Sequence, residues 1–167
     1  MHGHRYPIYS GKNIVIALDR DIYQIKMEGI THIVVKAEKT KKIFNAKKYD
    51  KEIFKQMALN IINKYNIETS NAIGVMFLEK INKKIKLHPT VWVKTIDTLF
   101  YETACASGTA AVAILKTIDK NSSQKLEVIQ PSSKIITANT ILKNGVLINA
   151  IISGKIKTDG KKRRLEI

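Results

Sequence analysis

The chain has 167 residues, enough for one domain with a hydrophobic core or for two very small ones. It carries 29 Lys and Arg against 14 Asp and Glu, a formal charge of +15, and its hydrophobic content of 44% excludes general disorder. Its single cysteine, Cys105, excludes an intrachain disulfide and a cysteine-based zinc cluster, and no apolar run approaches the roughly 20 residues that cross a bilayer. Because no N-terminal signal pattern is present, we expect a cytoplasmic protein without membrane association.

The first part of the chain predicts strands. Residues 13–18 and Ile22–Met27 are β-branched or alternate apolar with polar around a turn at 19–21, and they predict a hairpin. Ile30–Val35 predicts a third strand. His2 and His4 precede this region, and their place at the terminus favours a frayed end over a metal site.

The pattern then changes to a helical period. Residues 50–65 predict an amphipathic helix with Asp50 as its N-cap. We expect its apolar stripe to cover a sheet, and the stripe contains Ile53, Phe54, Met57, Ala58, Ile61, Ile62 and Tyr65.

Further strands are predicted on both sides of a second helix. Before that helix, residues 72–78 and 85–87 predict a hairpin, and residues 90–96 predict a further strand. Pro89 separates the hairpin from this strand, and we expect His88 to be a loop residue. The ranges predicted as strands after that helix are 126–129, 134–139, 146–153 and 155–157.

The second helix covers residues 106–118 and is rich in alanine with almost no polar face, which is typical of a buried helix. We therefore expect an α+β fold in which a bent, mostly antiparallel, barrel-like sheet wraps around this central helix, with the 50–65 helix packed outside.

Cys105 directly precedes the buried helix. A helix N-terminus offers unpaired N–H groups and a partial positive charge, which favour a carboxylate ligand and lower the pKa of a thiol. Glu102 adds an acidic group, and the small residues at 107–109 let a ligand approach the backbone. The turn thus suits an amino acid, with the thiol addressing its Cα proton. The alternative is that Cys105 is a small buried hydrophobic residue.

At this turn the chain resembles the diaminopimelate epimerase-like family of cofactor-independent amino-acid epimerases and racemases. A Glu-Thr-x-Ala-Cys-Gly-Ser/Thr-Gly-Ala stretch leads there into the central helix of the C-terminal half. The spacing is more similar to the histidine racemase branch, with its Glu-Asn-Ser-Cys-Gly-Ser-Gly-Thr-Ala pattern. The matching residues here are Glu102, Thr103, Ala104, Cys105, Ala106, Ser107, Gly108, Thr109 and Ala110.

Other segments follow the family's order. Residues 29–32 resemble a Gly-Asn-Pro-His segment, 131–133 a Pro-Gly-Gly turn, and 153–154 a Thr-Gly or Ser-Gly turn. The resemblance implies Cys105 as a catalytic thiol, no metal and no cofactor. It implies that the amino-acid substrate is bound by Glu102, Thr103, Ala106, Ser107, Gly108, Thr109, His32 and Asn71.

The chain also departs from the family. Ala106 replaces a glycine, and Ile30 replaces an asparagine whose amide would contact the substrate, which puts diaminopimelate in doubt. The family uses two cysteines, one from each half, whereas this chain has one. We therefore expect a C-terminal half alone, divided into a leading segment and hairpin at 1–28, an epimerase-like C-terminal lobe at 29–158 and a basic tail at 159–167.

A single lobe needs completion, because racemisation requires a base on each face of Cα. We expect a complementary N-terminal lobe on another chain, which could be acidic and so account for the charge of +15, or a homodimer. An inactive remnant and a basic, non-enzymatic binding protein are the alternatives. We do not expect nucleic acid as the partner, because no recognisable module for it is present. Asp97 could stand in for an acidic residue before the cysteine turn, or could simply end a strand.

Overall fold

The computed structural model describes residues 15–44, 50–67 and 71–155. They form an α+β structure dominated by one sheet of nine strands. In chain order the elements are β1 Val15–Asp19, β2 Ile22–Met27, β3 Ile30–Val35, α1 Ala37–Phe44, α2 Lys51–Lys64, β4 Ala72–Ile81, β5 Lys84–Val93, the 3-10 helix η1 Lys94–Ile96, β6 Thr98–Tyr101, α3 Ala106–Lys120, β7 Lys125–Ile129, β8 Ile135–Lys143 and β9 Val146–Gly154.

The sheet is mixed and open. Its strand order is β1-β2-β3-β4-β5-β7-β8-β9, with β6 also paired to β5. Most neighbours are antiparallel, as expected, but β3 pairs β4 in parallel and β5 pairs β7 in parallel. Because β1 and β9 do not pair with each other among the described residues, the expected barrel-like closure is not confirmed.

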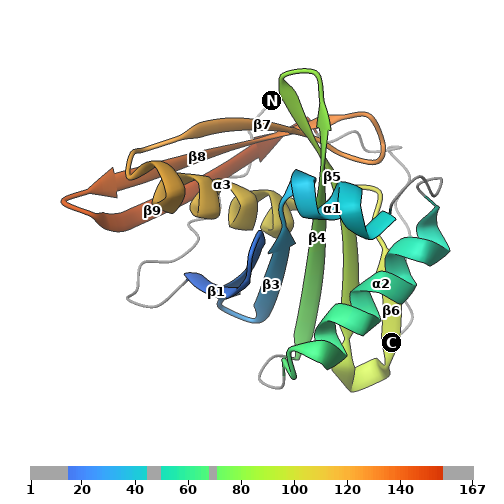
Figure 1. The fold of residues 1–167 in the computed structure, drawn as a ribbon. Coiled ribbons are helices and arrows are strands. Elements are labelled where there is room, and N and C mark those ends of the chain that lie inside the picture. The colour runs from blue at the N-terminus through green and yellow to red at the C-terminus, as the bar shows by residue number, and fades with distance from the viewer. Residues whose placement is uncertain (1–14, 45–49, 68–70, 156–167) are drawn as a thin grey trace, which may run out of the picture.

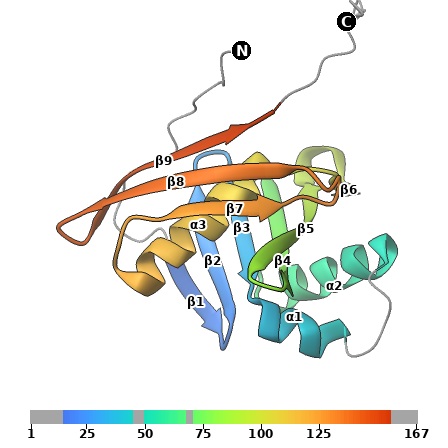
Figure 2. The same cartoon turned by 90° about the horizontal axis from the view of Figure 1, so that it is seen from above.

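The two faces of β3, β4 and β5 carry two separate cores, as the alternation of side chains along a strand requires. On one face, α3 lies between β1–β4 and the strands β7–β9 (Figures 1 and 2). Nine of its fifteen residues are buried, including the whole run from Gly108 to Leu115. On the other face, α2 packs through Phe54, Ala58 and Ile61.

Helix α2 begins where the sequence predicts. Asp50 is the N-cap of α2, and its side chain accepts a hydrogen bond of 2.9 Å from the backbone N–H of Glu52. Helix α1 was not predicted. It is short, and its first residues offer few apolar positions from which a helical period could be read.

The prediction that Pro89 and His88 lie in a loop is wrong, because β5 runs through both. The carbonyl of Pro89 accepts from Glu102 N at 3.0 Å, on the side away from β4. In a strand the N–H and C=O of one residue point to the same side, so the N–H that proline lacks is not needed by β4. On that side β6 pairs residues 90–93 of β5 and β7 pairs residues 85–86, and Pro89 lies between them.

Strands β7 and β9 lie within a residue of their predicted bounds, whereas β8, predicted at 134–139, extends to Lys143. Asn144 and Gly145, both with positive φ (50° and 73°), form the turn of the β8–β9 hairpin. Lys155 is not in a strand, which corrects the first residue of the strand predicted at 155–157. Residues 156–157, the tail at 159–167 and the two histidines near the start lie outside the described residues.

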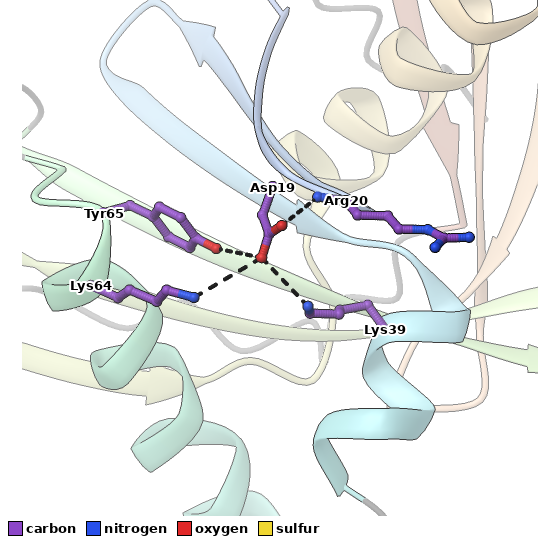
Figure 3. A network of polar contacts seen from close by, with 5 residues as sticks. All are labelled: Asp19, Arg20, Lys39, Lys64 and Tyr65. Atoms are coloured by element: carbon purple, nitrogen blue, oxygen red, sulfur yellow. Dashed lines mark hydrogen bonds and ion pairs between the residues drawn. The ribbon is translucent and has the colours of Figure 1, made fainter.

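An exposed carboxylate connects the first hairpin to both outer helices (Figure 3). Asp19 accepts hydrogen bonds from the backbone N–H of Arg20 at 2.7 Å and from the hydroxyl of Tyr65 at 3.1 Å. Its Oδ2 also lies 3.5 Å from Lys39 Nζ and 4.0 Å from Lys64 Nζ. The bonds to Arg20 and Tyr65 and the charge of Lys39 lower the pKa of Asp19.

No helix in the described part of the chain is long and apolar enough to cross a membrane.

Candidate functional site

Cys105 is the N-cap residue of α3. It has an extended backbone (φ −133°, ψ 107°), and its sulfur accepts a hydrogen bond of 3.3 Å from the N–H of Gly108. The residue is 4% exposed. The thiol therefore occupies the place that a serine or aspartate oxygen usually takes at a helix start, with free helix N–H groups around it.

A buried glutamine fixes the backbone of this turn. Gln130, at the end of β7, accepts from Cys105 N at 2.9 Å, and its amide donates to the Thr109 hydroxyl at 3.0 Å and to the carbonyl of Val128 at 3.2 Å. The Thr109 hydroxyl in turn donates to the carbonyl of Cys105 at 2.7 Å. Both the oxygen and the nitrogen of the Gln130 side chain are thus used. Gln130 fixes the backbone N–H of Cys105 directly and its backbone C=O through Thr109. No local motif predicts this role, because 25 residues separate Gln130 from Cys105 and the two meet only in the folded sheet.

The environment of the sulfur keeps the thiol protonated. Burial raises the pKa of Cys105 to about 12, and the negative charge of Glu102 and its hydrogen bond with the thiol act in the same direction. Ser107, whose hydroxyl lies 3.6 Å from the sulfur, and the N–H of Gly108 lower the pKa, but by less. The expectation that the helix end lowers the thiol pKa is therefore wrong for this lobe, because desolvation outweighs the dipole.

The packing under the thiol is tight. A Cβ added at Gly108 would overlap Met76 Sδ and lie 3.0 Å from the sulfur of Cys105. A Cβ added at Gly74 would overlap the His32 ring and lie 2.7 Å from Met76 Cε. The Met76 side chain thus lies between two glycines, one beside the cysteine and one beside the histidine, and the site has a closely packed, buried floor.

The structure separates two of the predicted substrate-binding residues from the turn. His32 is fully buried in β3 behind Met76, and burial lowers its pKa to about 4, so the ring is neutral. Neither ring nitrogen has a hydrogen-bonding partner among the described residues. The nearby backbone of Gly74 raises the pKa of the ring, but by less than burial lowers it. Asn71 is exposed at the start of β4, where its carbonyl accepts from Lys94 N at 2.9 Å. No described contact links either residue to Cys105.

A pocket of about 380 Å³ opens beside the cysteine turn. It collects three segments that the resemblance singled out, the cysteine turn, the 131–133 turn and the 153–154 turn, and Ser132 N donates to the carbonyl of Thr103 at 3.0 Å. Its wall is largely apolar. The lining residues are Ala104, Ala106, Gln130, Ser132, Lys134, Ile135, Ile136, Ile152, Ser153, Gly154 and Lys155.

The other predicted residues of the turn differ in exposure. Thr103 and Ala106 are exposed, Glu102 and Ser107 are half-buried, and Gly108 and Thr109 are buried inside the helix start. Asp97 has a structural position instead. It ends η1 in a left-handed conformation (φ 46°) and accepts from the indole N–H of Trp92 at 3.0 Å. Within the described residues no group of three or more His, Cys, Asp or Glu side chains could hold a metal.

Known proteins match this chain over most of its length. The family model described as "Histidine racemase CntK N-terminal domain" matches residues 11–161. Two proteins named histidine racemase, from Fusobacterium nucleatum subsp. nucleatum strains ATCC 23726 and ATCC 25586, are 33% and 31% identical over 109 residues. That segment is 65% of this chain and 36% of each relative, so the match spans about a third of the relatives' length.

A solved hydroxyproline epimerase from Agrobacterium vitis, with trans-4-hydroxy-L-proline bound, aligns with a TM-score of 0.46 and 11% identity over 90% of this chain and 48% of that one. The matching family model describes an N-terminal domain, so the expectation that this chain corresponds to the C-terminal half of its family is wrong. Because the model covers more than half of the chain and the cysteine turn lies within it, the chain belongs to the histidine racemase CntK N-terminal domain family.

Proposed function

We propose that this chain supplies one lobe of a cofactor-independent amino-acid racemase, with Cys105 as the acid–base group for one face of the substrate Cα. The observation that carries the proposal is the position of Cys105. Its thiol caps a buried helix beside a pocket of about 380 Å³ and is held there on both backbone sides by Gln130 and Thr109.

The substrate class is inferred from the chemistry of the cysteine turn and from the family. Free N–H groups at the start of α3 can bind a carboxylate, and Glu102, half-buried next to the thiol, can bind an ammonium group. Histidine is the first amino acid to test, because both relatives above are named histidine racemase.

The protonation state of Cys105 assigns its role in one direction of the reaction. A thiol with a pKa of about 12 is protonated at neutral pH. A base on the opposite face takes the α-proton and leaves the electron pair on Cα as a carbanion. The S–H of Cys105 then gives its proton to the other face, and the sulfur becomes a thiolate. In the reverse direction the two groups exchange roles, so protons and charge balance over the cycle.

The chain has one cysteine, so a two-thiol mechanism needs a second lobe to supply the opposite base. A homologous lobe or a second copy of this chain would place a thiol across the pocket. Docking of such a lobe would also remove water from the site, where helix N–H groups stabilise a carbanion most strongly.

The test is incorporation of deuterium at Cα of L-histidine and other L-amino acids in heavy water, followed by proton NMR. Two preparations are compared, the purified chain alone and the chain isolated from its own cells with whatever is bound to it. Exchange in either preparation that is lost in Cys105→Ser, and that persists in Thr95→Ser at an exposed position outside the site, is the expected result. Exchange in the first preparation indicates two copies, and exchange only in the second indicates another chain.

The proposal is contradicted if the folded protein exchanges no amino acid in either preparation, which would leave an inactive remnant. It is also contradicted if Cys105→Ser exchanges as fast as the unchanged chain.

A further inference from the structure

We propose that a lysine-lined pocket at the far end of α3 from Cys105 binds a phosphorylated small molecule of mononucleotide size. The pocket has a volume of about 320 Å³ and lies between the start of α1, the end of the β4–β5 hairpin and the last turns of α3. Its lining residues are Lys36, Ala37, Glu38, Leu78, Lys80, Lys83, Lys84, Ile85, Val112, Leu115, Lys116 and Asp119.

This pocket is separate from the proposed catalytic site. Lys116 follows Cys105 by about three helical turns, roughly 16 Å along the axis at 1.5 Å per residue. The pocket beside the cysteine and the lysine-lined pocket share no residue. A second lobe that faces the thiol therefore does not have to cover these lysines. Docking of an acidic lobe, which could account for the overall positive charge, does not explain why these lysines gather here.

The positive charge of the pocket is only partly neutralised. Lys36 Nζ lies 2.6 Å from Asp119 Oδ2, and this pair uses one of the two acids. Glu38 is the only other acid that lines the pocket, against Lys80, Lys83, Lys84 and Lys116, none of which forms an ion pair within the described part of the chain. Like charges gathered without counterions destabilise the folded chain, and a bound anion removes that cost.

Lys116 is a lysine of this pocket that both burial and its neighbours affect. Burial lowers the pKa of its ammonium group, and the charges of Lys120 and Lys80 lower it further. The partial negative charge at the end of α3 favours Lys116 and Lys120 there, but it does not account for Lys80, Lys83 and Lys84, which come from the β4–β5 hairpin.

The floor of the pocket is apolar. Leu78, Val112 and Leu115 are buried, and Ala37 and Ile85 are half-buried beside them. An apolar floor under a ring of ammonium groups fits a ligand with an apolar or planar body and several negative charges. Lysine is an effective point-charge ligand for phosphate, and the volume is at the lower end of the usual range for small-molecule sites.

A neighbouring hollow of about 470 Å³ extends the same charge. It shares Lys83, Lys84 and Lys116 and adds Lys125, with Glu127 as its one acid. A second hollow of about 550 Å³ has two lysines and two acids in its lining, so it adds no net positive charge. The first hollow gives the additional phosphates of a di- or triphosphate a further place to lie.

The test is a calorimetric titration of the full chain in 150 mM salt, where attraction between distant exposed charges is screened. The probes are ATP, AMP, adenosine, inorganic phosphate and a twelve-nucleotide RNA. The pocket variant is Lys80→Gln/Lys116→Gln, and the matched control is Lys51→Gln/Lys94→Gln, which removes the same charge from exposed positions outside the pocket.

We expect ATP to bind one-to-one and more tightly than AMP, with adenosine and phosphate alone much weaker. We expect the pocket variant to lose at least tenfold in affinity for ATP and the control less than twofold. Circular dichroism checks that both variants fold.

Three results overturn the proposal. Absence of binding to every probe is the first, and an equal loss in both variants, which indicates attraction to net charge alone, is the second. The third is an RNA that binds more tightly than ATP at this salt, which would assign the lysines to nucleic acid. Because no result here depends on Cys105, failure of this inference leaves the proposed racemase function standing, and the reverse also holds.

Discussion

The two ends of α3 are built in opposite ways. At the N-terminal end the backbone N–H and C=O of Cys105 are bonded to Gln130 and Thr109, the thiol is protonated and the packing leaves no room for one more carbon beside Gly108. At the C-terminal end the chain gathers lysines around a hollow, and burial together with the charges of Lys120 and Lys80 lowers the pKa of Lys116 there. The first end holds one side chain at a fixed place by hydrogen bonds and close packing, whereas for the second end we propose that a bound anion compensates the charge of the lysines.

The largest expected effect concerns the buried core beneath the thiol. The pKa of His32 is lowered from 6.5 to about 4, so the folded state binds its proton less tightly than the unfolded state does. The stability from the neutral ring is therefore complete above pH 6.5 and is lost as the pH falls toward 4, by about 3 kcal/mol for this one group. Urea unfolding at pH 7 and pH 4.5 measures the loss.

An NMR titration assigns that loss to His32. The pKa of His88, which lies on the opposite face of the sheet, is also lowered by burial, and its ring signals separate the two effects. A His32 ring that titrates near pH 6.5 in the folded protein would contradict the account of a buried core.

Gly108→Ala is expected to destabilise the cysteine end by about 2 kcal/mol, because the new Cβ overlaps the Met76 sulfur and the fully buried Met76 side chain must shift within a packed core. Denaturant unfolding gives the value. Gly145→Ala is the control. Its residue has a positive φ but no atom within 4 Å of the new Cβ, so its loss of stability should not depend on Met76. If Met76→Ala relieves none of the Gly108→Ala loss, the close approach is not its cause.

Gln130→Met removes the clamp while keeping a similar volume. It leaves Cys105 N without its described partner, so we expect a loss of about 1.5 kcal/mol in stability, together with a fall in α-proton exchange larger than any change in KM. The control is Gln56→Met, an exposed position on α2. A loss of stability with unaltered exchange would show that Gln130 supports the fold without positioning the thiol.

Glu102→Gln should increase the reactivity of the thiol severalfold. The charge of Glu102 raises the pKa of Cys105, so removing that charge lowers the pKa and increases the thiolate fraction at a fixed pH. The measurement is the rate of iodoacetamide modification from pH 7 to 10, with exposed Glu127→Gln as the control. An unchanged or slower rate in Glu102→Gln would contradict this electrostatic picture.

The smallest effect belongs to the charged end. Lys116→Gln removes one of several like charges and should stabilise the folded chain by a few tenths of a kcal/mol in low salt, with no gain in 1 M salt. Thermal unfolding at the two salt concentrations measures it. Destabilisation of the same size in both would mean that the ammonium group is bonded rather than repelled.

The sequence predicts more of the fold than of the site. The helical stripe of α2 and the alternation in β2 and β3 are local signals, and the structure places these elements within a residue of their predicted bounds. The loop prediction at Pro89 is wrong because a strand tolerates proline where the missing N–H faces no partner. In β5 that side is decided by β6 and β7, which both come later in the chain. The cysteine turn is a contiguous motif and could be found.

The remaining parts of the site are contacts over long sequence distances. Gln130 reaches the turn through a parallel pairing, Met76 contributes from β4, and the lysine pocket needs α1, a hairpin and α3 together. The raised pKa of Cys105 has the same origin, because burial by distant segments outweighs the local helix end that the sequence shows.

The central claim is that chemistry belongs to the cysteine end of α3 and not to the lysine end. The most direct measurement compares two variants, Cys105→Ser and Lys80→Gln/Lys116→Gln, for deuterium incorporation at Cα of L-histidine, in whichever preparation of the chain is active. The account predicts that the first variant loses exchange by at least a hundredfold and that the second stays within twofold of the unchanged chain. Exchange that survives in the first variant, or falls equally in both, would contradict it.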